Sequence, residues 1–375
     1  MKNSGNDPRV RWWEYGWYVM VMFLFLLVGI FLLIAGLITG KVGRLGRPAS
    51  YAVTIVSLLA ILGTWAAYQY YRPLNLADQR VAVIIKPGDS FGRVVDQLVS
   101  GGVVRSRLML KWPARLRGID RKLTTGRYTF SGHNSCQSVL ERLTRGEIDR
   151  VKVTIPEGLP IWKTAALLAR GLDLDSATVM GLNSDSSFLA AVDLPYLEGY
   201  LFPETYYFPW GVDERTVVTD MVGMFRTQTE TIWIDAHILG LNLDEIVRLA
   251  SIVEAETKVD SERAMVASVY CNRLRDKMRL DADPTVIYGL GGLERPLYQG
   301  DLRRETPYNT YIHKGLPPTP INSPGLAALR AAANPAPTEY YFFVADNRGG
   351  HRFSKTNAEH NRARREIQKE STPQP

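Results

Sequence analysis

The sequence predicts an α+β protein with transmembrane helices at its N-terminus, and three observations lead to this fold class. Two long uncharged runs, residues 15–40 and 48–71, stand near the start of the chain. Beyond residue 72 the pattern changes to short strands and short amphipathic helices. One strand–turn–helix pattern occurs twice there, beginning at residues 81 and 151. With 375 residues and 46% hydrophobic content, the chain can form two or three domains with a substantial core.

Each uncharged run is long enough to cross a membrane as a helix, because about 20 residues suffice at a rise of about 1.5 Å per residue. The loop "KVGRLGR" between the runs carries three basic residues and no acid. The positive-inside rule places this loop in the cytoplasm and everything after residue 72 outside it. The expected segments are a tail over 1–14, a first transmembrane helix over 15–40, a basic cytoplasmic loop over 41–50 and a transmembrane anchor over 51–71.

The start of the chain leaves two alternatives open. The second run with its basic flank resembles an uncleaved signal anchor by itself. The first run is then either a genuine extra helix or the product of a mis-called start codon. Both alternatives place the large domain outside the cytoplasmic membrane.

Charge and cysteine content exclude several classes of function. Residues 1–71 hold six Lys/Arg and two Asp/Glu, so they carry +4 of the formal charge of +7. The other residues are nearly balanced, which argues against a nucleic-acid partner, since such binders concentrate basic surface. No C-x-x-C or H-E-x-x-H motif occurs and the five histidines are scattered, so we expect no metal site and no cofactor. Cys136 and Cys271 are expected as two separate buried thiols, with a single disulfide as the alternative.

The repeated pattern follows a linker over 72–80. Six positions of the first copy match six of the second at a constant offset: Val81, Val83, Ile85, Gly88, Leu98 and Gly101 against Val151, Val153, Ile155, Gly158, Leu168 and Gly171. The glycines fall at the turn and after the helix, where positive φ is often needed. Chance similarity of short strand–helix units is the alternative.

An aromatic-rich stretch, "LPYLEGYLFPETYYFPWG", covers residues 194–211. Aromatic faces at a cleft suit the apolar faces of sugar rings, and Glu198 and Glu204 would bind hydroxyl groups there. The alternative is a packed loop core with the two acids at its rim.

Residues 249–274 read as a packed amphipathic helix that carries two glutamates against its apolar stripe. Asn242 and Glu245 form a capping-box pattern that predicts its start. At 100° per residue, Glu254 and Glu256 lie about 80° from the centre of the stripe, on opposite sides. A carboxylate at such a boundary loses hydration, which raises its pKa toward the value a general acid needs near neutral pH. The alternative is a pair of rim carboxylates bound to Arg248 or Lys258.

Five further motifs occur in a characteristic order. They are "EGYLFPETY", "SIVEAETKVDSERAMVASVYCNRL", "MRLDADPTVIYGLGG", "TPYNTYIHKGLPPTPINSPG" and "YYFFVADNRGGHRFSKTNAEHN". Together they resemble the YceG-like family, the endolytic murein transglycosylases, over roughly residues 80–365. The resemblance implies an enzyme of the cytoplasmic membrane with its catalytic domain on the outer side. It also implies a LysM-like peptidoglycan-binding region over 81–175, a catalytic domain over 176–365 and a disordered tail over 366–375. The family typically has one N-terminal span, so residues 15–40 depart from its pattern.

By the same resemblance the catalytic residue is Glu254, the first glutamate of the "SIVExET" motif. Such an enzyme cleaves the MurNAc–GlcNAc bond of nascent glycan strands and leaves 1,6-anhydro-MurNAc ends. Its partners would be peptidoglycan strands, the cytoplasmic membrane and peptidoglycan synthases. The residues expected to bind substrate are Glu198, Glu256, Asp283, Tyr308 and Asn309.

Several of these roles have alternatives. Asp283 either binds a sugar or anchors a turn, and Asn309 either binds an N-acetyl group or centres an Asn turn. A two-carboxylate hydrolase would use Glu256 or Asp283 beside Glu254. A wall-binding scaffold would need no acid against an apolar stripe.

Overall fold

The computed structural model describes residues 47–121, 123–232, 240–346 and 349–371, together with isolated positions between 20 and 34. The chain divides into two compact units, with the division between residues 149 and 150. We describe each unit by itself.

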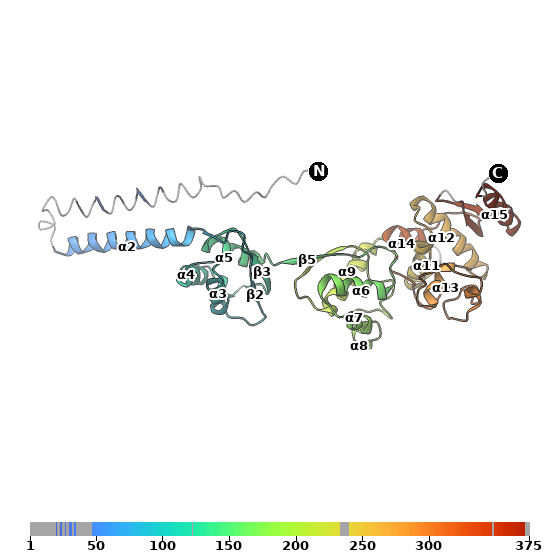
Figure 1. Cartoon of the computed structure of the whole chain (residues 1–375), viewed down its shortest axis with the longest axis horizontal. Coiled ribbons are helices and arrows are strands. Elements are labelled where there is room, and N and C mark those ends of the chain that lie inside the picture. Colours follow the sequence, from blue (N-terminus) through green and yellow to red (C-terminus); the bar gives the residue numbers. More distant parts are fainter. Residues whose placement is uncertain are drawn as a thin grey trace. The chain divides into compact units, whose positions relative to one another are not determined.

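The first unit is built on two antiparallel strands, β2 and β3, and helices pack against the face of this pair that points to the core (Figure 1). Its strands pair as β2 with β3 and β1 with β4. The elements are α2 (Arg47–Tyr71), β1 (Leu74–Asn75), β2 (Val81–Ile85), α3 (Phe91–Ser100), α4 (Arg107–Leu116), η2 (Ile119–Arg121), β3 (Gly126–Phe130), β4 (His133–Asn134) and α5 (Cys136–Arg145). Alternation decides which side chains of β2 face inward: Val83 and Ile85 are buried and Ala82 and Ile84 are exposed. Tyr128 and Phe130 of β3 complete this core with the apolar faces of α3, α4 and α5.

The segment expected as the transmembrane anchor, residues 51–71, is helical and forms most of α2. The first expected span, residues 15–40, lies outside the described residues apart from a few single positions. Among the helices composed of described residues, none combines the length and the apolar character needed to cross a membrane.

The second unit begins with the second copy of the repeat. β5 (Arg150–Thr154) and α6 (Ile161–Leu172) form the expected strand–turn–helix. β5 pairs along its whole length with β6 (Thr205–Pro209), and both pack with α6, α7 (Ser176–Leu182), α8 (Ser186–Ala191) and α9 (Glu214–Thr229) in one core. The expected boundary at residue 175 is therefore wrong, because the strand that begins at residue 150 finds its partner later in the chain, inside the second unit.

A second core of this unit surrounds α11 (Leu243–Glu256), which packs against α12 (Asp260–Arg275) and α14 (Leu326–Ala333) (Figure 1). Residues 249–274, expected as one helix, are two helices separated at residues 257–259. The remaining elements are α13 (Asp283–Gly289), η4 (Asp301–Arg303), the antiparallel pair β7 (Phe342–Ala345) and β8 (His351–Ser354), and α15 (Asn357–Ser371). The expected disordered tail over 366–375 is wrong for residues 366–371, which continue α15.

The glycines of the repeat serve two different purposes. At the turn, Gly88 and Gly158 have φ of 83° and 73°, as expected. After the helix the expectation of positive φ is wrong: Gly101 has φ of −75°, and Gly171 lies inside α6. There the missing side chain allows the helix to approach the strand, since a Cβ would lie 2.8 Å from Val81 Cγ1 at Gly101 and 2.8 Å from Val153 Cγ2 at Gly171.

We predict that Gly171→Ala destabilises the second unit. Val153 is β-branched and buried, so it has little freedom to turn away from the added methyl group. Overpacking of this kind costs about 1–3 kcal/mol, partly offset by the better helix propensity of alanine. The measurement is the free energy of unfolding in urea. Gly223→Ala in α9 is the matched control, because its Cβ meets open space, and an equal effect of the two substitutions would contradict the packing argument.

Candidate active site

Glu254 lies in the last turn of α11, whose start is fixed by the predicted capping box. The Glu245 backbone N–H donates to Asn242 Oδ1 at 2.9 Å, and the Asn242 N–H donates to Glu245 Oε2 at 2.8 Å. The predicted stripe of Ile246, Leu249, Ala250, Val253 and Thr257 is buried throughout. Glu254 leaves the helix beside this stripe, and its side chain is 8% exposed.

Two groups hold the Glu254 carboxyl group in place. Gly325 N–H, at the start of α14, donates to Oε2 at 3.1 Å, and Arg263 Nη2 of α12 lies 3.4 Å from Oε1. Neither Arg248 nor Lys258 is its partner, because Arg248 is bound to Asp244 one turn earlier. Burial raises the pKa of Glu254, and the Gly325 hydrogen bond and the Arg263 charge limit the rise. The group therefore holds its proton to higher pH than an ordinary glutamate, yet its anion has two partners.

The turn between β5 and α6 lies against Glu254. Gly158 N–H donates to Ser323 O at 2.9 Å, and Ser323 N–H donates to Leu159 O at 2.9 Å. This short antiparallel bridge joins the turn to the segment that leads into α14. A Cβ on Gly158 would lie 3.5 Å from Glu254 Cγ, so the turn packs closely on the glutamate stem.

An aromatic pocket opens next to this turn. It has a volume of about 250 Å³ and is lined by Gly158, Trp162, Ala255, Tyr288 and Asn322 among others. The Trp162 and Tyr288 ring centroids are 5.0 Å apart. Asn322 Oδ1 has no hydrogen-bond partner among the described residues, although its amide nitrogen donates to Ser251 O at 2.8 Å. Ala255 adjoins Glu254 in the chain, so the pocket is a neighbour of the candidate acid.

Glu198, expected to bind substrate, is only 2% exposed. Its carboxylate accepts hydrogen bonds from Ile161 N–H at 3.1 Å and from Tyr288 OH at 2.9 Å. The structure thus contradicts a direct sugar contact: Glu198 holds the start of α6 and orients Tyr288 from behind the pocket. The aromatic stretch around it is mainly packed core, as the alternative interpretation held, and Glu204 is exposed at its rim.

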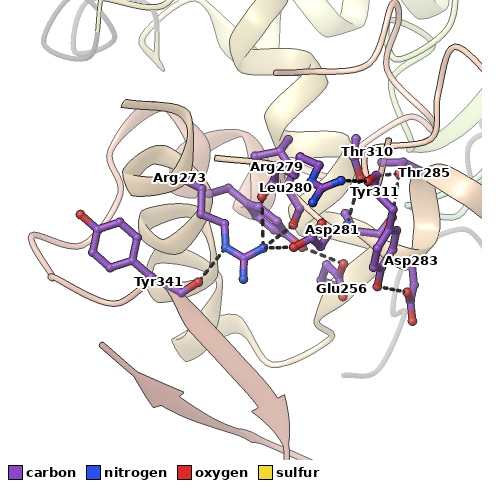
Figure 2. Close-up of polar contacts among 12 residues, drawn as sticks. Glu256, Arg273, Arg279, Leu280, Asp281, Asp283, Thr285, Thr310, Tyr311 and Tyr341 are labelled. Carbon is purple, nitrogen blue, oxygen red and sulfur yellow. Dashed lines mark hydrogen bonds and ion pairs between the residues drawn. The ribbon is translucent and has the colours of Figure 1, made fainter. Parts of the chain in front are cut away.

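Glu256 lies on the opposite flank of α11, in a separate polar network with α12 and α13 (Figure 2). Tyr270 OH donates to Glu256 Oε1 at 2.8 Å. Asp283, the first residue of α13, accepts from Tyr311 OH at 2.7 Å, and Arg273 reaches Asp281 and Leu280 O (Figure 2). Burial raises the pKa of Glu256 to about 7. Glu256 is therefore an internal support. Asp283 is exposed, and both predicted roles, sugar binding and turn anchoring, stay open for it.

Asn309 is fully buried and its amide is saturated. Nδ2 donates to Leu302 O at 3.0 Å and to Arg304 O at 2.8 Å, and Oδ1 accepts from Tyr311 N–H at 2.9 Å. The expected N-acetyl contact is contradicted, and the Asn-centred turn is what the structure contains. Tyr308 is half-buried, and its ring lies 4.7 Å from that of Tyr288, so it extends the aromatic wall behind Trp162.

The structure and the matches to known proteins agree on the family. The model of the YceG-like family matches residues 83–366. The chain belongs to the YceG-like family. An endolytic murein transglycosylase of Bacillus subtilis (strain 168) is 29% identical over 306 residues, which cover 76% of this chain and 84% of that protein.

Two more relatives extend the comparison. An endolytic murein transglycosylase of Streptococcus pneumoniae is 24% identical over 350 residues, which cover 83% of this chain and 63% of that protein. The crystal structure of a putative YceG-like protein from Listeria monocytogenes superposes with a TM-score of 0.54 at 28% identity, covering 76% of this chain and 98% of that one. The mixed α+β fold is therefore that of the YceG-like family.

Some site residues of this family member were missed in the sequence. Arg263, Gly325 and Trp162 surround Glu254 and its pocket but belong to three distant segments. Trp162 stands two residues after Pro160, directly after the repeat turn, and this place in the chain was the available signal for a half-buried aromatic residue near a binding site. Among the described residues, no group of three or more His, Cys, Asp or Glu side chains is arranged to hold a metal ion. Cys136 and Cys271 are separate free thiols, as expected, but only Cys136 is buried and Cys271 is half-buried.

We predict that the two buried glutamates make the protein less stable as the pH rises from about 4.5 to about 7. Burial raises the pKa of both Glu198 and Glu256 from 4.5 to about 7 in the folded protein. The unfolded chain then binds fewer protons in this window, so the free energy of unfolding falls with pH, by up to about 3 kcal/mol for each group. Urea denaturation at several pH values measures this slope.

Glu198→Gln and Glu256→Gln should each flatten that pH dependence, because glutamine does not titrate. Glu339→Gln is the control, since Glu339 is exposed and its pKa is lowered by the hydrogen bond from Lys355. An unchanged slope in the variant carrying both buried substitutions would disprove the prediction.

Proposed function

We propose that the chain is a membrane-anchored endolytic peptidoglycan lytic transglycosylase. It cleaves the MurNAc–GlcNAc bond of nascent glycan strands, leaves 1,6-anhydro-MurNAc ends and so terminates strand elongation. The observation that carries the proposal is Glu254, a carboxyl group that is 8% exposed, has a raised pKa and lies beside an aromatic pocket. The names of the relatives from Bacillus and Streptococcus support the same reaction.

In the first step Glu254 donates its proton to the glycosidic oxygen as the bond from C1 to that oxygen breaks. Desolvation raises the pKa of Glu254 above its ordinary value, which favours the protonated form that the first step needs. The anion that remains accepts a hydrogen bond from Gly325 N–H and interacts with Arg263, so proton loss is not prohibitive.

In the second step the muramyl 6-hydroxyl attacks C1 and closes the 1,6-anhydro ring. The hydroxyl proton returns to the Glu254 carboxylate, which restores the starting state. One residue acts as acid and then as base, and water is not consumed. The aromatic pocket beside Ala255 would hold a sugar ring against Trp162 during both steps.

The hydrolase alternative is less well supported. It names Glu256 or Asp283 as a second carboxylate, and these two belong to the network on the other flank of α11. The scaffold alternative leaves the burial of Glu254 without a purpose, since a carboxyl group with a raised pKa serves proton transfer and not adhesion.

The part of the first unit that follows α2 would hold the glycan strand as a LysM-like module. Residues 51–71 would anchor the enzyme in the cytoplasmic membrane, with everything after residue 72 on its outer side and peptidoglycan synthases as neighbours. The apolar character of the runs and the basic loop between them support this placement.

We predict that Glu254→Gln abolishes cleavage while it preserves glycan binding. Glutamine keeps the shape of the side chain but cannot donate and recover a proton, so the rate should fall by at least about 10²-fold. Purified wall glycan is digested, and the new ends are identified by mass spectrometry as anhydro-muramyl or reducing ends. Reducing ends from the wild type, or full activity of Glu254→Gln, would refute the proposed reaction. Glu256→Gln tests the specificity of the effect, because that side chain is expected to support the fold only.

The proposed topology is testable with reporter fusions. A reporter joined after Arg80 should be active only outside the cytoplasm, and a tag between Lys41 and Arg47 should be protected from external protease. The physical reason is the retention of basic loops on the cytoplasmic side. Cleavage of that tag in intact cells would overturn the orientation.

A further inference from the structure

The carboxylate of Glu157 lies against Gly325, the residue whose backbone N–H donates to Glu254. A Cβ built on Gly325 would lie 2.0 Å from Glu157 Oε1 and 2.1 Å from Glu157 Cδ. The Glu157 carboxylate therefore packs directly on the Gly325 Cα, in space that any side chain at position 325 would enter. Gly325 N–H meanwhile donates to Glu254 Oε2 at 3.1 Å. The two acids flank one backbone residue, and the Glu157 charge acts on Glu254.

Backbone hydrogen bonds fix the turn that carries Glu157. Glu157 stands in the turn between β5 and α6, followed by Gly158 with φ of 73°. The Gly158 N–H to Ser323 O bond and the bridge between Leu159 and Ser323 join this turn to the segment just before Gly325.

Glu157 is also free to meet a ligand. Its side chain is exposed, and among the described residues none donates a hydrogen bond to it or forms an ion pair with it within 4.0 Å. Glu198 and Glu256, by contrast, are buried and bonded to tyrosine hydroxyls. Glu157 precedes Gly158, a residue that lines the aromatic pocket, so an acid without a described partner stands next to the pocket lining.

We propose that Glu157 is a second catalytic residue, whose carboxylate contacts the muramyl ring and stabilises the positive charge that develops at C1. This inference rests on the proposed function. When the glycosidic bond breaks, its electron pair leaves with the oxygen, which takes the Glu254 proton. C1 and the ring oxygen then share a positive charge until O6 bonds to C1 and gives its proton to Glu254. Glu157 forms no bond and transfers no proton; it lowers the energy of the cationic transition state.

Glu157→Gln tests the proposal in the full-length protein. Removal of a preorganised charge at a buried site costs about 10²–10³-fold, and for a solvent-exposed carboxylate we expect a loss of roughly tenfold in kcat. The pH profile adds a readout that a structural role would not change. Burial raises the pKa of Glu254 and the Glu157 charge raises it further, so loss of that charge should move the alkaline limb of kcat/KM to lower pH.

Gly325→Ala gives the same test without any change to Glu157. The new methyl group would displace the flexible end of Glu157, while the backbone N–H that binds Glu254 remains. We expect the alkaline limb to move in the same direction and kcat to fall. Glu339→Gln and Gly223→Ala are matched controls, the first an exposed acid paired with Lys355 and the second a helical glycine whose Cβ meets open space. Both should behave as the wild type.

The outcomes separate this inference from the proposed function. If Glu254→Gln is inactive while Glu157→Gln and Gly325→Ala keep wild-type kcat and an unmoved alkaline limb, the reaction stands and the role of Glu157 is refuted. If the wild type makes no anhydro ends, the reaction itself is wrong. If thermal unfolding shows that Glu157→Gln is not folded, the result for Gly325→Ala decides whether Glu157 has the proposed role, because that substitution leaves the sequence of the turn intact.

Discussion

The carboxyl group of Glu254 must be kept away from water and must still have partners for its anion, and much of the second unit serves these two demands. Burial beside the stripe of α11 raises its pKa, whereas a lone buried carboxylate would become too weak an acid to give up its proton. Gly325 N–H supplies one interaction from the start of α14, where backbone N–H groups and the helix dipole favour negative charge. Arg263 supplies the other from α12. Three helices thus contribute one group each to a single proton-transfer site.

The loop over residues 321–325 connects these helices to the repeat turn. Ile321 N–H donates to Ser251 Oγ at 3.1 Å, and Asn322 donates to Ser251 O at 2.8 Å, one turn before Glu254 on α11. On its other side the loop forms the bridge between Ser323 and Leu159. Ser251 is therefore the residue of α11 that binds the loop leading to Gly325. A rigid support of this kind is what general acid catalysis requires, because proton transfer depends on distances fixed to a fraction of an ångström.

Local sequence patterns were sufficient to predict the helix that carries Glu254, but not the residues that surround Glu254 in the folded protein. Asn242 and Glu245 marked the start of α11, and 100° steps placed Glu254 at the edge of its buried face. The break before α12 carried no such signal, since Val259 caps that helix without a side-chain hydrogen bond. Asn309 was undecided because an amide suited to an N-acetyl group is equally suited to three backbone partners. The second repeat copy was placed in the wrong unit because β-pairing with β6 is a long-range choice that the repeat itself does not encode.

The four glutamates around the second core show why spacing alone does not assign chemistry. Burial raises the pKa of Glu198 and of Glu256 to about 7, yet a tyrosine hydroxyl donates a hydrogen bond to each of them from inside the protein. Glu254 is 8% exposed and directly precedes Ala255, which lines the pocket, and Glu157 is exposed against Gly325. In the proposed reaction these environments divide the work: Glu254, withdrawn from water, transfers the proton, and Glu157, exposed, stabilises the developing positive charge. The loop over residues 321–325 and the repeat turn surround Glu254 and Glu157, the pair proposed for catalysis, whereas tyrosine hydroxyls bind Glu198 and Glu256.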